Sequence, residues 1–525
     1  MQNLPLEIID NIVEFLSTKE DATEQLLEPR LAPYSTISTH FLEAVQRRLW
    51  RRLFLFSDDL DYCASLLLRR RRLSHLRLLT LHIIVDETEE NKALCFERPA
   101  GTKVVSRQFG ICLQRVFGML EQGTNLQLSF FESEHNDTGR YDGHEHRFQF
   151  YRHSRSRITL PRANGLPMLH SVRHLSFYYW IRRPDPSVQL VIAARMPDLA
   201  ALDLFIEATD LRYPGALRKD RKSLADALVN YSKQTEQLSH VTLDMNQITC
   251  PIDNTGAMPN LTYPLTYDLL GSSLRVWSQR LTSFKVCGVF DETLFWPQAH
   301  ETNDAADRPY WSNMQHFIVM LEANTPSGWW YFMPEGEHDY GKAPRDPAQD
   351  PEDMPPVFLD NDAGDAGDAG LSDYLAERQH EKELFEMVKA TSRTRNVPRE
   401  DLMGPLFDAW ARALACMPSL RSASLRFHVE DHNWRGYKLH TYMLDWEVAY
   451  ETPMHRTPKP FGGKEWYSDM TSTERASMRL VFHNTCGWRP SKEAMDLLMT
   501  TGSENWPGTS IVVLDVYNWS EIVRS

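Results

Sequence analysis

The sequence predicts an α/β protein in which a small helical unit precedes an irregular solenoid with a largely parallel sheet. Three observations predict this fold. Apolar residues near the N-terminus recur at helical spacing, and beyond about residue 70 short Leu-x-x-Leu-x-Leu runs replace them. Two of these runs also follow a helical segment that stops at a proline. Helix, stop and short strand in succession are typical of a leucine-rich-repeat-like array.

Residues 1–56 form the predicted helical unit. Five apolar residues fall on one face of its first helix: Ile8, Ile9, Ile12, Val13 and Leu16. Pro5 suits the first turn, where its missing N–H would have had no helical partner. A second amphipathic segment is expected to carry Ile37, Phe41, Leu42, Val45, Leu49, Trp50 and Leu53 on its apolar side. Helices this short bury little surface alone, so we expect the unit to need a partner or the rest of the chain.

Residues 57–525 form the predicted array. Its strand-like runs have their last apolar residue at positions 81, 130, 177, 204, 243, 286, 319, 425 and 516. Three runs are preceded by Pro-x-Leu, at Pro167, Pro197 and Pro418, and a proline in this place ends a helix before the strand begins. A regular leucine-rich repeat spans about 20–29 residues. The intervals here are longer and uneven, so we expect degenerate repeats with long insertions.

One insertion, residues 335–373, has a different composition from the rest of the chain. It holds twelve Asp or Glu against Lys342 and Arg345, and it contains the tract DAGDAGDAG. Such a segment cannot bury enough apolar surface to offset the entropy of its chain, and we expect it to be disordered.

Overall composition excludes several classes of protein. The chain is 42% hydrophobic, and its 71 acidic against 57 basic residues give a net charge of −14, which argues against nucleic acid as a partner. No apolar stretch approaches the roughly 18 residues of a membrane helix, and the N-terminus does not read as a secretory signal. Seven scattered cysteines, none in a Cys-x-x-Cys pair, indicate reduced thiols. We therefore expect a cytoplasmic or nuclear protein.

Motifs that carry catalysis or bind cofactors are missing. The sequence has no nucleotide-binding glycine loop and no Gly-x-Ser-x-Gly elbow. His144 and His146 flank a glutamate but lack the next ligand of a His-Glu-x-x-His site, and His428 and His432 follow a strand-like run that would not hold them on one helix face. We expect no cofactor, no metal and no enzymatic activity.

Tryptophans concentrate between residues 296 and 330. Trp329 and Trp330 end the turn-forming sequence Pro-Ser-Gly-Trp-Trp, which places them at the edge of a loop. Exposed loop aromatics are common in binding hot spots, so these two residues are candidates for binding another protein. The alternative is that they fill an irregular core.

The N-terminal motifs resemble those of an F-box. The family pattern opens with Leu-Pro-x-Glu-Ile, passes an apolar-Ser step and closes with Leu-Trp-x-x-Leu. The matching residues are Leu4, Pro5, Glu7, Ile8, Ile37, Ser38, Leu49, Trp50 and Leu53. Phe41 stands where the family usually has tryptophan, and residues 17–30 lengthen the middle. The rest of the chain is similar to the C-terminal region of filamentous-fungal F-box proteins, through the phrases LAPYSTIS, SDDLD, FWP and PSGWW.

The resemblance implies a substrate-recognition subunit of a cullin–RING ubiquitin ligase of the SCF type. The F-box would dock a Skp-family adaptor, and through it a cullin, while the repeat domain would hold an unidentified client protein. Ubiquitin transfer would belong to other subunits. The implied adaptor-binding residues are Leu4, Pro5, Glu7, Ile8, Ile12, Leu16, Ile37, Phe41, Leu49 and Trp50.

Two alternatives stay open at this point. One is an F-box interaction scaffold that never joins a ligase, and the other is a metal-dependent enzyme that uses the histidine pairs. The receptor hypothesis requires that Ile8, Ile12 and Leu16 leave apolar surface for another polypeptide to cover.

Overall fold

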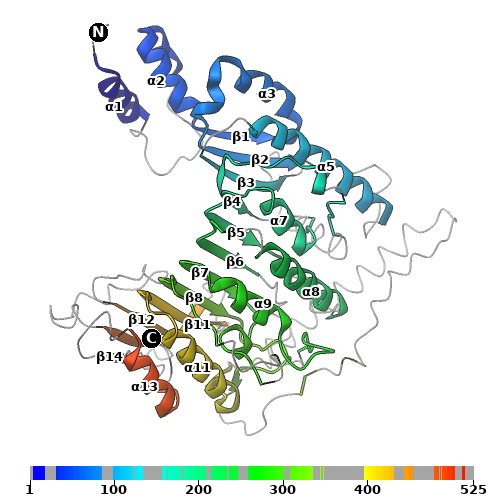
Figure 1. Cartoon of the computed structure of the whole chain (residues 1–525), viewed down its shortest axis with the longest axis vertical. Helices are drawn as coiled ribbons and strands as arrows, with labels where there is room; N and C mark the ends of the chain where they lie inside the picture. The colour runs from blue at the N-terminus through cyan, green and yellow to red at the C-terminus, as the bar shows by residue number, and fades with distance from the viewer. Residues whose placement is uncertain are drawn as a thin grey trace, which may run out of the picture.

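The computed structural model describes residues 4–514 with gaps, of which the longest are 18–30, 85–98, 134–156, 246–257, 348–394, 431–442 and 453–477. Within these ranges the protein is a mixed α/β structure built on one large sheet (Figure 1). No helix among the described residues is long and apolar enough to cross a membrane.

Strands of the large sheet follow one another in the order of the chain. In the described residues they are β1 (Arg52–Phe56), β2 (Leu78–Ile84), β3 (Leu126–Ser133), β4 (Val172–Phe177), β5 (Ala201–Phe205), β6 (His240–Asp244), β7 (Ser283–Gly288), β8 (His316–Leu321), β11 (Ser422–Glu430), β12 (Met443–Glu451), β13 (Arg479–His483) and β14 (Ile511–Leu514). From β1 to β11 every pairing is parallel; β12 then pairs antiparallel with β11 and with β13, and β14 is parallel to β13. The prediction of a largely parallel sheet is confirmed, and all nine Leu-x-x-Leu-x-Leu runs lead into or lie in strands.

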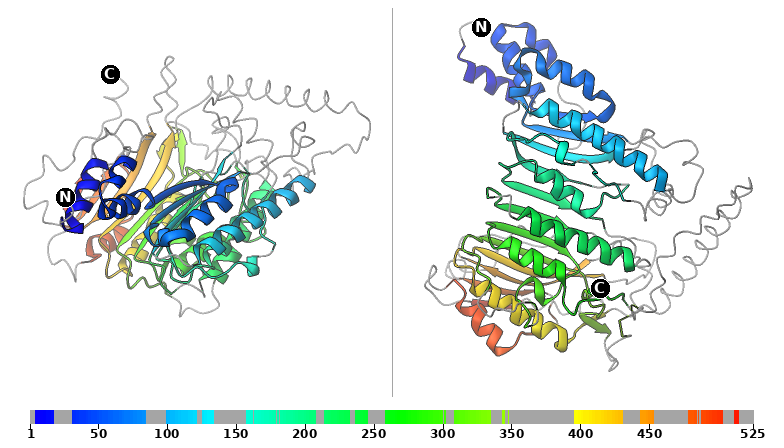
Figure 2. Two further views of the ribbon diagram at one scale, coloured as in Figure 1. Left: turned by 90° about the horizontal axis from the view of Figure 1, so that it is seen from above. Right: turned by 45° about the vertical axis from the view of Figure 1, so that its right-hand side comes forward.

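Helices occupy one face of this sheet. They are α3 (Leu60–Leu68), α5 (Pro99–Leu120), α7 (Pro186–Ala193), α8 (Pro214–Tyr231), α9 (Leu269–Ser278), α11 (Glu400–Ala415) and α13 (Lys492–Thr500). Figure 2 shows α5, α7, α8, α9 and α11 side by side on the same face, each beside the strands that it connects. The two helices expected before Pro197 and Pro418 are confirmed as α7 and α11, which end four and three residues before their prolines.

The large core lies between the sheet and these helices. Because side chains alternate between the faces of a strand, every second residue points at the helices. One row of such residues is in register across five strands: Leu175, Leu202, Val241, Phe284 and Phe317. All five are buried. The regular leucine spacing therefore reflects one continuous apolar layer shared by neighbouring units.

The N-terminal helices lie beside β1 at one end of the sheet (Figure 1). They are α1 (Leu6–Ser17), the 3-10 turn η1 (Ala32–Thr36) and α2 (Thr39–Leu49). The expectation that the second helix extends to Leu53 is wrong, because Arg52–Phe56 is a strand paired with β2. The sequence Arg-Leu-Phe-Leu-Phe alternates with the period of a strand, and its two leucines pack on the large core.

The segments on either side of the acidic insertion lie between β8 and β11 in the chain. They pair antiparallel as β9 (Phe332–Pro334) and β10 (Arg395–Pro398). Nearly all of residues 335–373, for which we predicted disorder, lie outside the described residues.

Candidate functional site

Helix α1 begins directly after Pro5. The carbonyl oxygen of Pro5 accepts hydrogen bonds from the backbone N–H groups of Ile8, at 3.1 Å, and Ile9, at 3.2 Å. Proline is well suited to this place because it has no N–H of its own to leave unpaired at a helix start. The Leu-Pro opening therefore sets where the helix starts, and with it which residues face inward.

Helix α2 begins at a serine cap. The hydroxyl of Ser38 accepts a hydrogen bond from the backbone N–H of Phe41 at 3.2 Å, which satisfies one donor of the first turn. The cap fixes the direction in which α2 leaves the η1 turn, and so places Phe41 and Val45 against α1.

These two helices enclose a small core of their own. Its buried residues are Ile9, Val13, Leu31, Phe41, Ala44 and Val45, with Leu4 and Leu49 packed at its margin. This cluster is separate from the large core under the sheet. The ion pair between Arg47 Nη2 and Asp10 Oδ1, 3.1 Å apart, also joins α2 to α1.

The outer side of the helical unit is apolar as well. Ile8 is 45% exposed, Ile12 is 36% exposed and Ile37 is 43% exposed. Ile8 and Ile12 are four residues apart, so they share one face of α1. Tyr34, which our sequence reasoning did not select, is a further exposed aromatic residue on this unit. A solvated helix normally carries polar residues here, so this uncovered apolar surface is the candidate docking surface.

The other residues implied by the F-box resemblance have different environments. Pro5 and Glu7 are exposed, Leu4 and Leu49 are half-buried against the small core, and Phe41 is buried in it. Trp50 is half-buried against the large core, with the guanidinium of Arg72 4.7 Å from its ring. The side chain of Leu16 lies outside the described residues. The predicted set therefore divides into surface residues and residues that hold the unit together.

Further aromatic residues are exposed beside the helical unit. Phe54 and Phe56 are 67% and 47% exposed on β1, and Tyr62 is 70% exposed on α3. Strand β1 is also the outer strand of the sheet, so one of its edges has no strand partner in the described structure. The alternation in Arg-Leu-Phe-Leu-Phe was the signal that should have identified this strand.

The sheet face away from the helices is polar. Ser176, Asp203, Thr242 and Lys285 are in register on four neighbouring strands, and we call them the polar row. Their neighbours along each strand point into the large core, so alternation places the row on the face away from the helices, which we call the polar face. Lys285 is exposed, Asp203 and Thr242 are half-buried, and Ser176 is fully buried.

His174 joins this row next to Asp203. Its Nε2 lies 2.7 Å from Asp203 Oδ2 and 3.1 Å from Ser176 Oγ, while Ser176 Oγ donates to the same carboxylate oxygen at 2.9 Å. Burial raises the pKa of Asp203, but hydrogen bonds from His174 and Ser176 outweigh it and hold that pKa below its usual value. In a hydrolytic triad the carboxylate and the serine contact different imidazole nitrogens. Here both contact Nε2, so these three residues do not have the arrangement of a hydrolytic triad.

The two candidate tryptophans are only partly accessible. Trp330 is 6% exposed, and its backbone forms a bridge with Asn324 across the Pro-Ser-Gly turn. Trp329 is half-buried, with the guanidinium of Arg399 5.1 Å from its ring. The turn itself is present as expected, and Gly328 has a φ of +89° that favours glycine. Their role in client binding stays a prediction, with Trp329 the better placed of the two.

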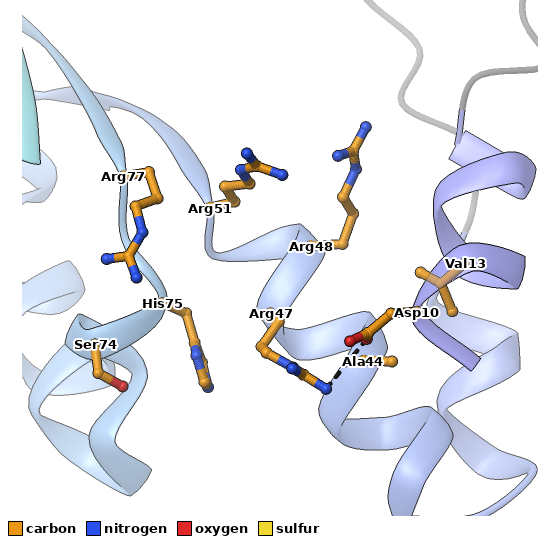
Figure 3. Close-up of a pocket in the computed structure, with 9 residues that line it drawn as sticks. All are labelled: Asp10, Val13, Ala44, Arg47, Arg48, Arg51, Ser74, His75 and Arg77. Atoms are coloured by element: carbon orange, nitrogen blue, oxygen red, sulfur yellow. Dashed lines mark ion pairs between the residues drawn. The ribbon is translucent and has the colours of Figure 1, made fainter. Parts of the chain in front are cut away.

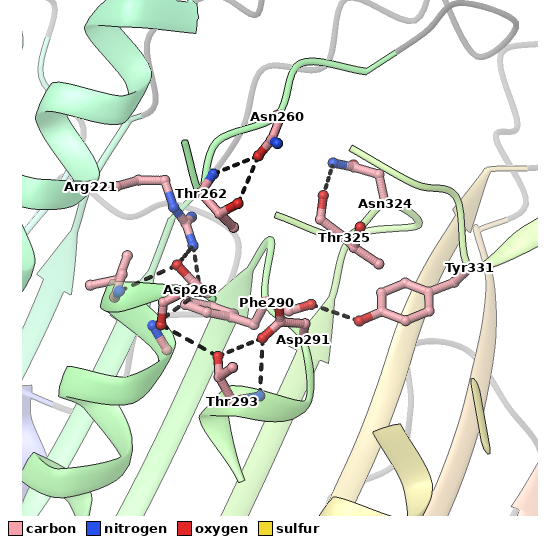
Figure 4. Close-up of polar contacts among 12 residues, drawn as sticks. Arg221, Asn260, Thr262, Asp268, Phe290, Asp291, Thr293, Asn324, Thr325 and Tyr331 are labelled. Atoms are coloured by element: carbon pink, nitrogen blue, oxygen red, sulfur yellow. Dashed lines mark hydrogen bonds and ion pairs between the residues drawn. The ribbon is translucent and has the colours of Figure 1, made fainter. Parts of the chain in front are cut away.

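A buried polar network lies near the ends of strands β6 to β8 (Figure 4). Arg221 Nη2 donates to both carboxylate oxygens of Asp268 at 2.7 Å, and Asp268 caps α9 by accepting from the N–H of Gly271 at 3.0 Å. Thr293 donates to Asp291, and burial raises the pKa of Asp291 well above its usual value, helped by the nearby Asp268. These contacts join residues of the network to one another, while Nε and Nη1 of Arg221 are buried without a hydrogen-bond partner among the described residues.

No group of three or more His, Cys, Asp or Glu side chains in the described ranges is arranged to hold a metal ion. His144, His146 and His432 lie outside those ranges, as does the side chain of His428. No protein-family model matches the chain, and no curated protein matches it either. The fold and its surfaces therefore define the protein only as an α/β sheet protein with two candidate recognition surfaces.

Proposed function

We propose that this protein is the substrate receptor of a cullin–RING ubiquitin ligase. The N-terminal helices would dock a Skp-family adaptor, and the sheet would hold the client. The observation that carries the proposal is the division of α1 into two apolar faces. Ile9 and Val13 are buried against α2, while Ile8 and Ile12 remain exposed. Such a helix packs against its own unit through one apolar face and still presents a second apolar face to another polypeptide.

The arrangement of the chain also suits a receptor. The docking unit lies at one end of a long sheet, and the sheet extends away from it (Figure 2). A client bound along the sheet would be held by the same chain that docks the adaptor. We also propose that the N-terminal helices are an F-box and that the sheet and its helices are a leucine-rich-repeat-like array. The proposed location is cytoplasmic or nuclear.

The polar face of the sheet is the surface that we assign to the client. Its polar row offers the half-buried carboxylate of Asp203 on β5 and the exposed cation of Lys285 on β7, with β6 between them. The backbone ladder fixes where these side chains leave the sheet, so their spacing is set before a partner binds. Trp329, in the turn between β8 and β9, is a further candidate for client contact.

The adaptor half of the proposal is tested by charged substitutions on the exposed face of α1. The double variant Ile8→Asp/Ile12→Asp should lose co-purification with a Skp-family adaptor, because the interface would have to bury two carboxylates. The matched control is Val104→Asp/Ile111→Asp on α5, where the two side chains are 45% and 43% exposed. The control should retain the adaptor at the wild-type ratio.

The outcomes separate the alternatives. Adaptor retained by the α1 variant, or lost equally by the control, would contradict docking through this face. Adaptor without a cullin in the purified complex would indicate a scaffold outside any ligase. Adaptor and cullin together, both lost with the α1 variant, support the receptor.

A further inference from the structure

A cationic cavity lies at the joint between the helical unit and the sheet. Its volume is about 330 Å³, and its charged or titratable lining residues are Asp10, Arg47, Arg48, Arg51, His75 and Arg77. They come from three parts of the chain: α1, the C-terminal end of α2 with the residues after it, and the turn that leads into β2. Figure 3 shows the four guanidinium groups around the cavity, with the Asp10 carboxylate facing Arg47.

The charges that line this cavity do not balance. Among the described lining residues Asp10 is the one carboxylate, and it pairs with Arg47 at 3.1 Å. Glu43 lies close enough to His75 to influence its titration, although it does not line the cavity. Four guanidinium groups and one carboxylate line this cavity, and three of the guanidinium groups, those of Arg47, Arg48 and Arg51, come from five consecutive residues. Like charges at such distances repel, and a bound anion relieves that repulsion.

Arg47 shows where an anion would be held. Its Nε is buried, and no hydrogen-bond acceptor in the described part of the chain reaches it. A buried N–H donor without an acceptor is costly, and more so when the group is charged. Planar guanidinium groups match the oxygen atoms of phosphate particularly well.

We propose that this cavity binds a small, multiply charged oxyanion of the phosphate type. The volume is at the lower end of the roughly 300–1,000 Å³ typical of ligand pockets. It therefore suits a compact anion such as a diphosphate group better than a peptide. The anion would contact Arg47, Arg48 and Arg51 from the α2 side and Arg77 from the β2 side, and so would tie the helical unit to the sheet.

The experiment uses the full chain and sodium pyrophosphate as the probe. Titration calorimetry is carried out without divalent metal ions and at ionic strength held constant with chloride. Wild-type protein should bind one equivalent saturably, and its melting temperature should rise with the logarithm of the pyrophosphate concentration. The variant Arg48→Gln/Arg51→Gln should bind about tenfold more weakly or worse, because two charge-assisted contacts are lost.

The matched control is Lys103→Gln/Arg107→Gln, which removes the same charge from two exposed positions on α5. Its affinity should stay within about twofold of wild type, since exposed charges at a distance are screened. If the Arg48/Arg51 variant fails to fold, the single variant Arg51→Gln, at an exposed residue, replaces it. Equal weakening in both double variants would show general attraction by charge and would overturn the site.

Vesicles that contain a phosphorylated inositol lipid form the second arm. Vesicle binding that the Arg48/Arg51 variant loses would assign the anion to a lipid headgroup. Saturable pyrophosphate binding without vesicle binding would assign it to a free anion. Binding to neither probe, or binding only to an acidic or phosphorylated peptide, would overturn the proposal.

Discussion

Arg183 and Glu207 form an ion pair inside the protein, with Nε of the arginine 3.6 Å from Oε2 of the glutamate. Both side chains are almost completely buried, at 2% and 4% exposure. Arg183 comes just before α7, and Glu207 comes just after β5, the strand that follows α7. The pair therefore joins the start of this helix to the end of the next strand. Burial raises the pKa of Glu207 to about 7, although Arg183 and Arg157 act to lower it.

This shift predicts a dependence of stability on pH. The unfolded chain releases the proton of Glu207 near pH 4.5, whereas the folded chain keeps it until about pH 7. Between these values the folded state binds more protons, so the free energy of unfolding falls as the pH rises. The variant Glu207→Gln cannot titrate at this position. Its free energy of unfolding should therefore fall by about 3 kcal/mol less than that of wild type over this pH range. Denaturant unfolding from pH 4 to pH 8 measures it.

A suitable control for the pH experiment is Asp226→Asn, at an exposed pair with Lys222 on α8. Exposed pairs of this kind contribute well under about 1 kcal/mol. Its unfolding curve should therefore follow that of wild type at every pH. The same pH slope in wild type and in Glu207→Gln would show that another group is responsible.

The separation of the two cores predicts that the helical unit unfolds independently. Ile9→Ala opens a cavity in the small core and should raise hydrogen exchange in α1 while leaving the main unfolding transition in place. Leu204→Ala, in the large core, should lower the main transition by about 2–5 kcal/mol. Hydrogen-exchange mass spectrometry measures the opening of α1, and denaturant titration measures the main unfolding transition. A main transition lowered equally by both variants would contradict the separation.

Gly271 is predicted to be intolerant of any side chain. A Cβ atom there would lie 2.7 Å from Thr293 Oγ1 and 2.9 Å from Asp268 Oδ2, inside the buried network. Gly271→Ala should cost about 1–3 kcal/mol, because neither atom can move without losing its hydrogen bond. Gly118→Ala on α5, where nothing lies within 4 Å, should instead stabilise by up to about 1 kcal/mol. Thermal unfolding of the pair tests this, and a neutral Gly271→Ala would contradict the packing.

Removing the carboxylate from the cationic cavity should strengthen anion binding. Asp10→Asn removes the one carboxylate among the described residues that line the cavity. We expect pyrophosphate affinity to rise several-fold in calorimetry, since the anion no longer competes with Asp10 for Arg47. The ion pair is partly exposed, so the free energy of unfolding should fall by less than about 1 kcal/mol. Unchanged or weaker binding would mean that Arg47 does not take part.

Much of the fold could be predicted from local patterns. The leucine runs that end at residues 81 to 516 identify strands because alternate residues of each must enter one apolar layer. The antiparallel strands β12 and β13 were missed. Trp446 and Val448 are buried in β12, but the segment lacks the Leu-x-x-Leu spacing that marked the others.

What the sequence by itself determined is the strands that carry the leucine runs, the helices before Pro197 and Pro418, and the wide apolar side of the first helix. Only the tertiary structure decided that Ile9 is buried while Ile8, its neighbour, stays exposed, because that choice depends on where α2 packs. The cationic cavity likewise unites Asp10, Arg51 and Arg77, which come from separate segments. Periodicity is a local property of the chain, whereas burial and the meeting of charges depend on how distant segments pack together.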